Sequence, residues 1–157
     1  MTSKSRQKTE AEEANDTAVR LLARREHSRQ ELFSKLTGRG LERSVIDDAL
    51  DGLVSRGLLS DERFAESFVR HRIGQGHGPM RICADLRQRG VSEPQVQAAL
   101  EAAETDWEAL ARDVRLRRFG RTFPGDYRER SKQMRFLQYR GFPTDIIRRV
   151  MTDEDKT

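Results

Sequence analysis

The 157-residue sequence is poor in cysteine, histidine and aromatic residues, and it has no long apolar run. Its single cysteine, Cys83, excludes an intramolecular disulfide and a cysteine-based zinc site. No apolar stretch approaches the roughly 18 residues that cross a bilayer, and the polar residues 1–15 lack the apolar region of a signal peptide. The three histidines are scattered without metal-ligand spacing. These absences predict a cytoplasmic protein, not bound to a membrane, that is not an enzyme and uses no metal or cofactor.

Charge, by contrast, is abundant and uneven. Charged residues make up 36% of the chain, and 30 Lys and Arg against 26 Asp and Glu give a net charge of +4. Codon bias and selection for the planar guanidinium group both explain why most of these cations are Arg. Residues 105–151 carry twelve cations and six anions, whereas residues 58–104 carry six cations and seven anions. The last third is therefore the expected contact surface for a polyanion.

The apolar pattern is helical. Ile46, Ala49, Leu50 and Leu53, for example, fall at the i, i+3, i+4, i+7 spacing of one helix face. Capping-box sequences predict helix starts at three places, and glycines mark five expected helix ends. The predicted caps are Ser28, Ser92 and Thr105, and the glycines are Gly40, Gly57, Gly90, Gly120 and Gly141. No stretch alternates apolar and polar residues as a strand would, so the sequence predicts an all-α fold.

An internal repeat organises these helices. Residues 27–50 align without a gap on residues 77–100, with six identities in 24 positions, and a further shift of 51 continues the frame into the last third. A helix precedes each copy, so the predicted units are three tandem three-helix repeats in an elongated, curved arrangement. Their expected bounds are 14–57, 58–104 and 105–152, between disordered tails at 1–13 and 153–157.

Single residues in this frame have ordinary structural interpretations. Cys83 occupies a core position, and His27 and His77 are repeat-equivalent residues just before a helix start, which favours a capping or linking role. Two helices joined at a glycine are also typical of helix-turn-helix DNA binding. The second helices expected at 45–55 and 93–103 carry almost no Arg to contact bases. Direct DNA binding, transcriptional or nonspecific, stays as the alternative function.

Cations cluster in all three units, and in the third they alternate with aromatic residues, which suits contact with phosphates and stacking on bases. The predicted partner-binding or nucleic-acid-binding residues are Arg24, Arg25, Lys35, Arg39, Arg70, Arg72, Arg87, Arg89, Arg115, Arg117, Arg118, Arg121, Lys132, Arg135 and Arg140.

Three short motifs, in this order within a triple repeat, carry a family resemblance. They are Asp-Glu-Arg-Phe-Ala at 61–65, Arg-Gly-Val at 89–91 and Arg-Gly-Phe at 140–142. Over about residues 14–151 the chain resembles the RecX family, which regulates the bacterial RecA recombinase in homologous recombination, DNA repair and the SOS response.

The resemblance implies both a partner and an activity. RecX-like proteins bind in the groove of the RecA filament on single-stranded DNA and inhibit its ATPase, strand-exchange and co-protease activities, without being enzymes themselves. We therefore expect a monomer that binds the filament and binds DNA directly only weakly. The slightly acidic middle unit is a departure that puts in doubt equal contact of all three units with nucleic acid.

Overall fold

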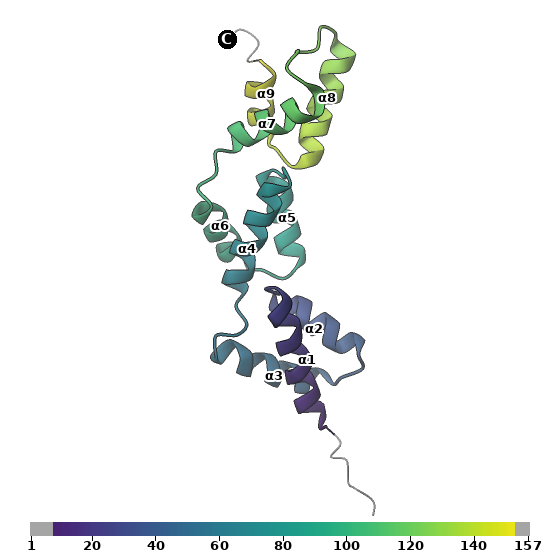
Figure 1. Cartoon of the computed structure of the whole chain (residues 1–157), viewed down its shortest axis with the longest axis vertical. Coiled ribbons are helices and arrows are strands. Elements are labelled where there is room, and N and C mark those ends of the chain that lie inside the picture. Colours follow the sequence, from purple (N-terminus) through teal and green to yellow (C-terminus); the bar gives the residue numbers. More distant parts are fainter. Residues whose placement is uncertain (1–7, 153–157) are drawn as a thin grey trace, which may run out of the picture. The chain divides into compact units, whose positions relative to one another are not determined.

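The computed structural model describes residues 8–152, which form nine α-helices and contain no strand (Figure 1). The helices fall into three consecutive groups of three, which confirms the predicted all-α fold of tandem three-helix repeats. Their bounds are α1 Glu10–Arg24, α2 Arg29–Gly38, α3 Arg43–Ser55, α4 Asp61–Gly74, α5 Pro79–Gln88, α6 Glu93–Ala102, α7 Trp107–Phe119, α8 Tyr127–Arg140 and α9 Thr144–Met151. The elongated, curved arrangement stays a prediction.

By internal contacts the chain divides into two compact units. The first contains the residues up to Ala65 together with Arg89–Val91, and the second contains Glu66–Gln88 and the residues from Ser92 onward. The middle group of helices, α4 to α6, therefore contributes to both units. Residues 89–91, directly after α5, belong to the first unit, whereas α5 itself belongs to the second.

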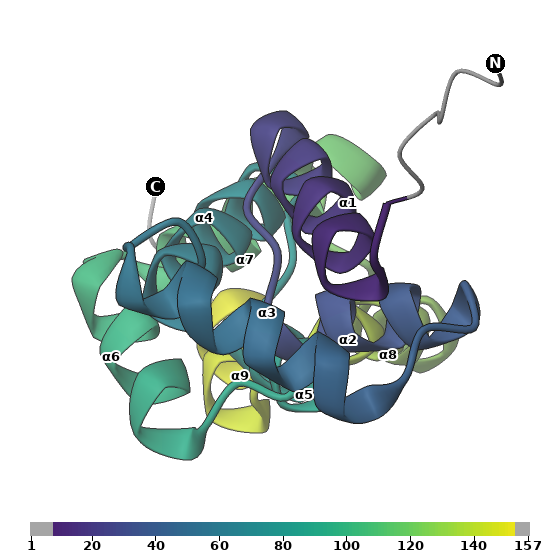
Figure 2. The same ribbon diagram turned by 90° about the horizontal axis from the view of Figure 1, so that it is seen from below.

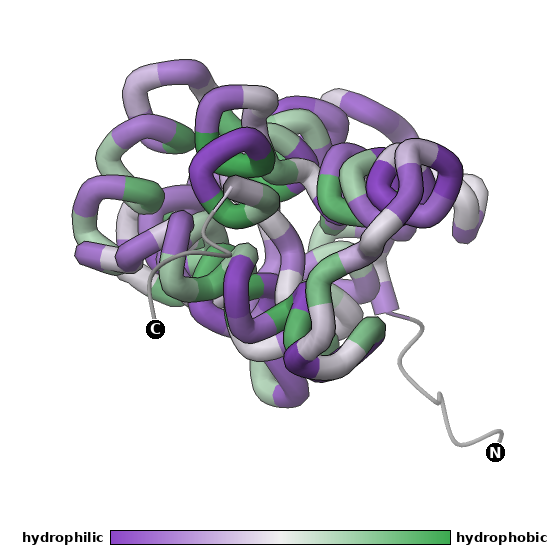
Figure 3. Tube along the Cα trace, turned by 90° about the horizontal axis from the view of Figure 1, so that it is seen from above, coloured by the Kyte–Doolittle hydropathy of each residue, from purple (hydrophilic) through white to green (hydrophobic). Residues whose placement is uncertain are grey.

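The core of the first unit lies among α1, α2 and α3. In Figure 2, α1 lies across α3, and buried Ala18, Leu36 and Leu50 come from the three helices in turn. These residues are fully removed from solvent, and burying a leucine side chain stabilises the fold by about 2 kcal/mol. Within the turns of the helices, hydrophobic and hydrophilic residues are mixed (Figure 3), and the hydrophobic ones supply the buried side. Each helix thus keeps one polar side.

A second core joins α7, α8 and α9. It contains Ala111, Leu137, Phe142, Ile147 and others, all buried. Helix α9 is the most amphipathic in sequence, with four of its eight residues buried. This core positions the outward side of α8, which carries most of the candidate site residues described below.

The predicted helix caps have different outcomes. The capping box at Ser28 and Glu31 is confirmed, because the Ser28 hydroxyl accepts from the Glu31 N–H and the Glu31 carboxylate accepts from the Ser28 N–H. Ser92 does precede α6, but its hydroxyl donates to the Gln95 side chain and makes no backbone cap. The prediction for Thr105 is wrong, since α7 is capped by the neighbouring Asp106, which accepts from the Ala109 N–H.

The predicted helix ends are confirmed more consistently than the predicted helix starts. All five predicted glycines have a positive φ, between +72° and +101°. At the other end of the chain, α1 begins at Glu10, earlier than a disordered tail through residue 13 would allow. The reason is local: Thr9 accepts from the Glu12 N–H, and acidic residues in the first turn stabilise the helix dipole. The rest of that tail, residues 1–7, and the tail at 153–157 lie outside the described residues.

Candidate functional site

An exposed cationic face runs along α8. Arg128, Lys132, Arg135 and Tyr139 follow one another at spacings of four, three and four residues, so they share one side of the helix. All four are exposed, and the Tyr139 side chain is 74% exposed. Within residues 8–152 none of the three cations forms an ion pair. We call these four residues the α8 face; free cations beside an exposed aromatic ring suit phosphate contact and base stacking.

Beside the α8 face, three predicted arginines line one cleft of about 470 Å³. Arg118 and Arg140 both lie against the ring of Phe136, with guanidinium carbons 5.8 and 5.0 Å from its centroid, within the range of a cation–π contact. The third, Arg117, pairs with Asp113 one turn earlier on α7 at 3.1 Å. The cleft thus brings together Arg118 and Arg140, which are 22 positions apart in the sequence. Their positive charges lie beside the ring of Phe136, which lines the cleft.

Unlike Arg117 and Arg118, which line the cleft, Arg115 lies in the interior of the protein. Its side chain is buried, with only 4% of the residue exposed, and its guanidinium group lies 3.9 Å from the centre of the Phe123 ring. Nε donates to the Gln133 side chain at 3.0 Å, and Nη2 donates to the Thr122 carbonyl at 3.0 Å. These contacts hold the α7–α8 loop against α8. Arg115 therefore stabilises the third group of helices, α7 to α9, which we call the third domain, from inside. Its position argues against direct contact with a partner.

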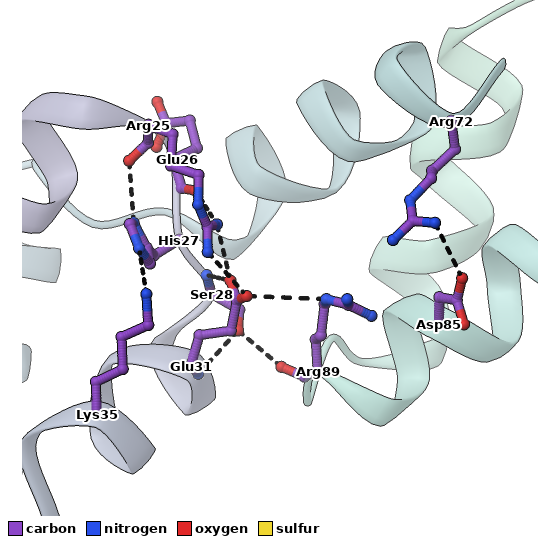
Figure 4. Close-up of polar contacts among 9 residues, drawn as sticks. All are labelled: Arg25, Glu26, His27, Ser28, Glu31, Lys35, Arg72, Asp85 and Arg89. Carbon is purple, nitrogen blue, oxygen red and sulfur yellow. Dashed lines mark hydrogen bonds and ion pairs between the residues drawn. The ribbon is translucent and has the colours of Figure 1, made fainter. Parts of the chain in front are cut away.

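Among residues 8–65, two of the predicted cations already have partners (Figure 4). Arg25 pairs with the Glu31 carboxylate at 3.3 Å. The Lys35 ammonium group lies 3.3 Å from Nε2 of His27, which is only 2% exposed. Because an ammonium group only donates, Nε2 accepts, and Nδ1–H then donates to the Arg25 carbonyl at 3.1 Å. Two further predicted cations are exposed and form no ion pair within residues 8–152: Arg24 and Arg39.

The predicted cations on α4 and α5 are mostly neutralised locally. Arg87 forms two hydrogen bonds to the Glu93 carboxylate, at 2.7 and 2.8 Å, which lower the pKa of Glu93 to about 2. Arg72 lies 3.8 Å from Asp85. Only Arg70 is exposed without an ion pair in the described part of the chain. This pairing fits the slightly acidic composition of the middle group of helices.

The third domain therefore holds most of the unpaired positive charge among the predicted residues. Sequence reasoning placed Lys132, Arg135 and Tyr139 near other cations but did not recognise that they share a face with Arg128. Their spacing of four, three and four residues would have predicted this shared face of the helix. The remaining predicted cation of this domain, Arg121, is exposed in the α7–α8 loop. Arg89, which pairs with Glu31 at 3.8 Å, belongs to the first unit.

Three further findings concern the described residues. In residues 8–152, no group of three or more His, Cys, Asp or Glu side chains is arranged to hold a metal ion. No helix in this range is both long enough and apolar enough to cross a membrane. Cys83 is buried, as predicted, and burial raises the pKa of its thiol.

The fold defines a class: all-α proteins built of tandem three-helix domains, here with most of the unpaired charge in the third. Family models match each domain in turn, namely the first, second and third three-helix domains of RecX, at residues 14–53, 60–100 and 104–151. The chain belongs to the RecX family of regulatory proteins.

Individual relatives agree with this membership. The chain is 49% identical over 146 residues to the regulatory protein RecX of Halorhodospira halophila, covering 93% of this chain and 91% of the relative. It is 48% identical to that of Pseudomonas putida strain GB-1, covering 88% and 89%. The crystal structure of RecX from Lactobacillus salivarius has the same fold, with a TM-score of 0.76 at 22% identity over 92% of this chain and 96% of that one.

Proposed function

We propose that this protein is a negative modulator of the RecA recombinase. It binds in the groove of the RecA filament on single-stranded DNA and inhibits the filament's ATPase, strand-exchange and co-protease activities. It acts as a monomer in the cytoplasm, without a cofactor and without catalysis of its own, and it binds bare DNA weakly. The observation that carries this proposal is membership of the RecX family across all three domains, together with the unpaired charge of the α8 face.

The mechanism follows from the position of the charge. The α8 face meets DNA phosphates or acidic filament surface, and the first two domains, whose predicted cations are largely paired, add further contacts along the groove. Contacts from linked domains add through effective concentration, so none of them has to be strong alone. A protein that fills the groove blocks entry of a duplex, and by bridging subunits it opposes the movements that accompany ATP turnover.

The operator-binding alternative receives less support. The exposed side of α3 carries Asp47, Asp48 and Asp51. Arg29 pairs with Asp47 and Asp51, but the group stays net negative, and a phosphate backbone would be repelled by it. A major-groove reading helix instead places cationic and amide side chains against base edges. We therefore keep direct DNA binding as an outcome of the test below and not as a second proposal.

The test neutralises the α8 face in a triple variant, Arg128→Gln, Lys132→Gln and Arg135→Gln. Each phosphate contact to a single strand contributes about 0.7 to the slope of log affinity against log salt, or about 1 kcal/mol at 0.1 M salt. Loss of three contacts should weaken binding about 100-fold and reduce the slope by about 2. Binding is measured by fluorescence anisotropy with RecA assembled on a labelled oligo(dT) strand.

A control variant removes the same charge elsewhere. Arg20→Gln, Arg43→Gln and Arg148→Gln change three exposed cations that belong to no predicted site, and this variant should bind within about threefold of the unchanged protein, since exposed charges at a distance are largely screened at this salt. Equal binding by both triple variants, with both folded, would refute the role of the α8 face. Nanomolar binding of the unchanged protein to bare DNA with a base-sequence preference would favour the alternative function.

A further inference from the structure

The second helix of each domain ends in the same tripeptide pattern: arginine, glycine and an apolar residue. The three copies are Arg39-Gly40-Leu41, Arg89-Gly90-Val91 and Arg140-Gly141-Phe142. The apolar residue is buried in each case, and the glycine has a φ of +84°, +83° or +101°. The three copies therefore have the same local shape, and we call them the Arg-Gly ends of α2, α5 and α8.

The Arg-Gly end of α8 docks on the N-terminus of α5. The Gly78 N–H donates to the Arg140 carbonyl at 2.7 Å, and the Met80 N–H donates to the Gly141 carbonyl at 3.0 Å. The C-terminal carbonyls of one helix thus satisfy free N–H groups at the start of another, with favourable alignment of partial charges. The approach is close, since a β-carbon on Gly141 would lie 2.7 Å from the Arg81 nitrogen.

The Arg-Gly end of α5 makes the corresponding contact within the first unit. The Ser28 hydroxyl at the N-terminus of α2 donates to the Arg89 carbonyl at 2.8 Å, and the Arg89 side chain pairs with Glu31 at 3.8 Å (Figure 4). A β-carbon on Gly90 would lie 2.7 Å from Cβ of Gln30. Ser28 and Gly78 are fifty residues apart and equivalent in the repeat, so an Arg-Gly end meets the equivalent helix start twice, through a hydroxyl at Ser28 and through backbone N–H groups at Gly78 and Met80.

The third copy, the Arg-Gly end of α2, docks on no helix start within the described residues. Nothing lies within 4 Å of the β-carbon position on Gly40, and both Arg39 and Gly40 are exposed. Within residues 8–152 no group donates a hydrogen bond to the carbonyl of either residue, and Arg39 forms no ion pair. A surface that docks on a helix start in two of its three copies is thus presented to solvent in the third.

We infer that the Arg-Gly end of α2 docks on the N-terminus of a helix in a subunit of the RecA filament. This inference rests on the proposed function, and it names one contact through which the first domain holds the filament. The two internal examples define the partner's chemistry as a small N-cap residue such as serine or glycine and free donor groups at the helix start. The example at α2 adds a carboxylate at the third helical position, Glu31, which pairs with Arg89, and a carboxylate at that position of the partner would pair with Arg39 in the same way.

A second copy of this chain fits the Arg-Gly end of α2 less well. The second helix of the last domain, α8, begins after Asp126, whose carboxylate already accepts from the Glu129 N–H. At that position the docked helices have Ser28 or Gly78, which donate to a carbonyl. The Asp126 carboxylate has no proton to donate in place of the Ser28 hydroxyl, and it would repel the carbonyl oxygens, so head-to-tail association is an outcome to be measured and not the inference.

The experiment compares two glycine substitutions of equal local cost. Gly40→Asn adds a side chain to the open Arg-Gly end, and Gly57→Asn adds one after α3, where φ is also positive (+72°) and nothing lies within 4 Å. Asparagine tolerates positive φ better than most residues, so both variants should fold, as circular dichroism will check. Loss of two hydrogen bonds should weaken binding of Gly40→Asn to RecA on oligo(dT) about 30-fold, and Gly57→Asn should bind normally.

A second pair tests the charge without touching the backbone. Arg39→Glu should weaken filament binding at least tenfold, whereas Arg43→Glu, an exposed neighbour without an ion pair in the described residues, should change it by less than threefold. Normal binding by both Gly40→Asn and Arg39→Glu would overturn this inference and leave the proposed function standing. Failure of the unchanged protein to bind the filament would overturn both this inference and the proposed function. If the unchanged protein forms concentration-dependent dimers that Gly40→Asn does not form, the Arg-Gly end of α2 binds a second copy of this chain instead.

Discussion

Arg115 offers a sharp test of how the third domain is held together. Replacement by methionine keeps the length of the side chain and removes the guanidinium group. The change deletes the hydrogen bonds to Gln133 and Thr122, both at 3.0 Å, and the contact with the Phe123 ring at 3.9 Å. Hydrogen bonds to a charged donor contribute about 1.5 kcal/mol each, and a desolvated cation–π contact contributes about 1 to 2 kcal/mol. The expected loss is about 4 kcal/mol in the free energy of unfolding.

The assay is urea unfolding followed by fluorescence. Trp107 is the only tryptophan and packs against the core of α7, α8 and α9, so its emission reports on this domain. Arg117→Met is the matched control, because Arg117 is on the same helix, has a 78% exposed side chain and pairs only with Asp113 within the described residues; it should cost less than about 0.5 kcal/mol. A loss below 1 kcal/mol for Arg115→Met would refute the structural role and reopen Arg115 as a contact residue.

Two predictions concern pH. Burial lowers the pKa of both His27 and His77 below the ordinary 6.5, so their contribution to stability is complete above pH 6.5 and is lost as the pH falls below it. The Tm should therefore fall between pH 7.5 and 5.0, and the double variant His27→Gln, His77→Gln should show a smaller fall; an equal fall would contradict the assignment. For Glu93, whose pKa is about 2, the stabilising pair is complete above pH 4.5 and is lost as the pH falls through about 2. An NMR titration should place its midpoint near 2 in the unchanged protein and clearly higher in Arg87→Gln, though still below 4.5 because Gln97 continues to donate to the Glu93 carboxylate; a midpoint that does not move would show that Arg87 is not the cause.

Local sequence signals predicted the elements of the fold well. The Ser28 capping box and the positive-φ glycines depend on neighbouring residues only, and the structure confirms them. Thr105 and Asp106 are adjacent and both able to cap. In the structure the Asp106 carboxylate accepts from the Ala109 N–H, whereas the Thr105 hydroxyl donates to the Ala103 carbonyl, a choice that the sequence does not reveal. The fifty-residue repeat predicted three domains because each domain repeats the same pattern of buried positions.

The candidate site was less predictable, because exposure and pairing depend on tertiary contacts. Arg115 follows the buried Ala111 by four residues and so shares the inner side of α7, a signal that the charge of the side chain concealed. The pairing of Arg89 with Glu31 joins residues 58 positions apart. No local rule relates them. The docking of the Arg-Gly ends likewise became visible only in the folded chain.

The most direct test of the whole account is the ATPase rate of RecA on single-stranded DNA, measured as this protein is titrated in. The rate should fall progressively with added protein, and the triple variant of the α8 face should require a much higher concentration for the same inhibition. An unchanged ATPase rate, at protein concentrations well above that of RecA, would contradict it.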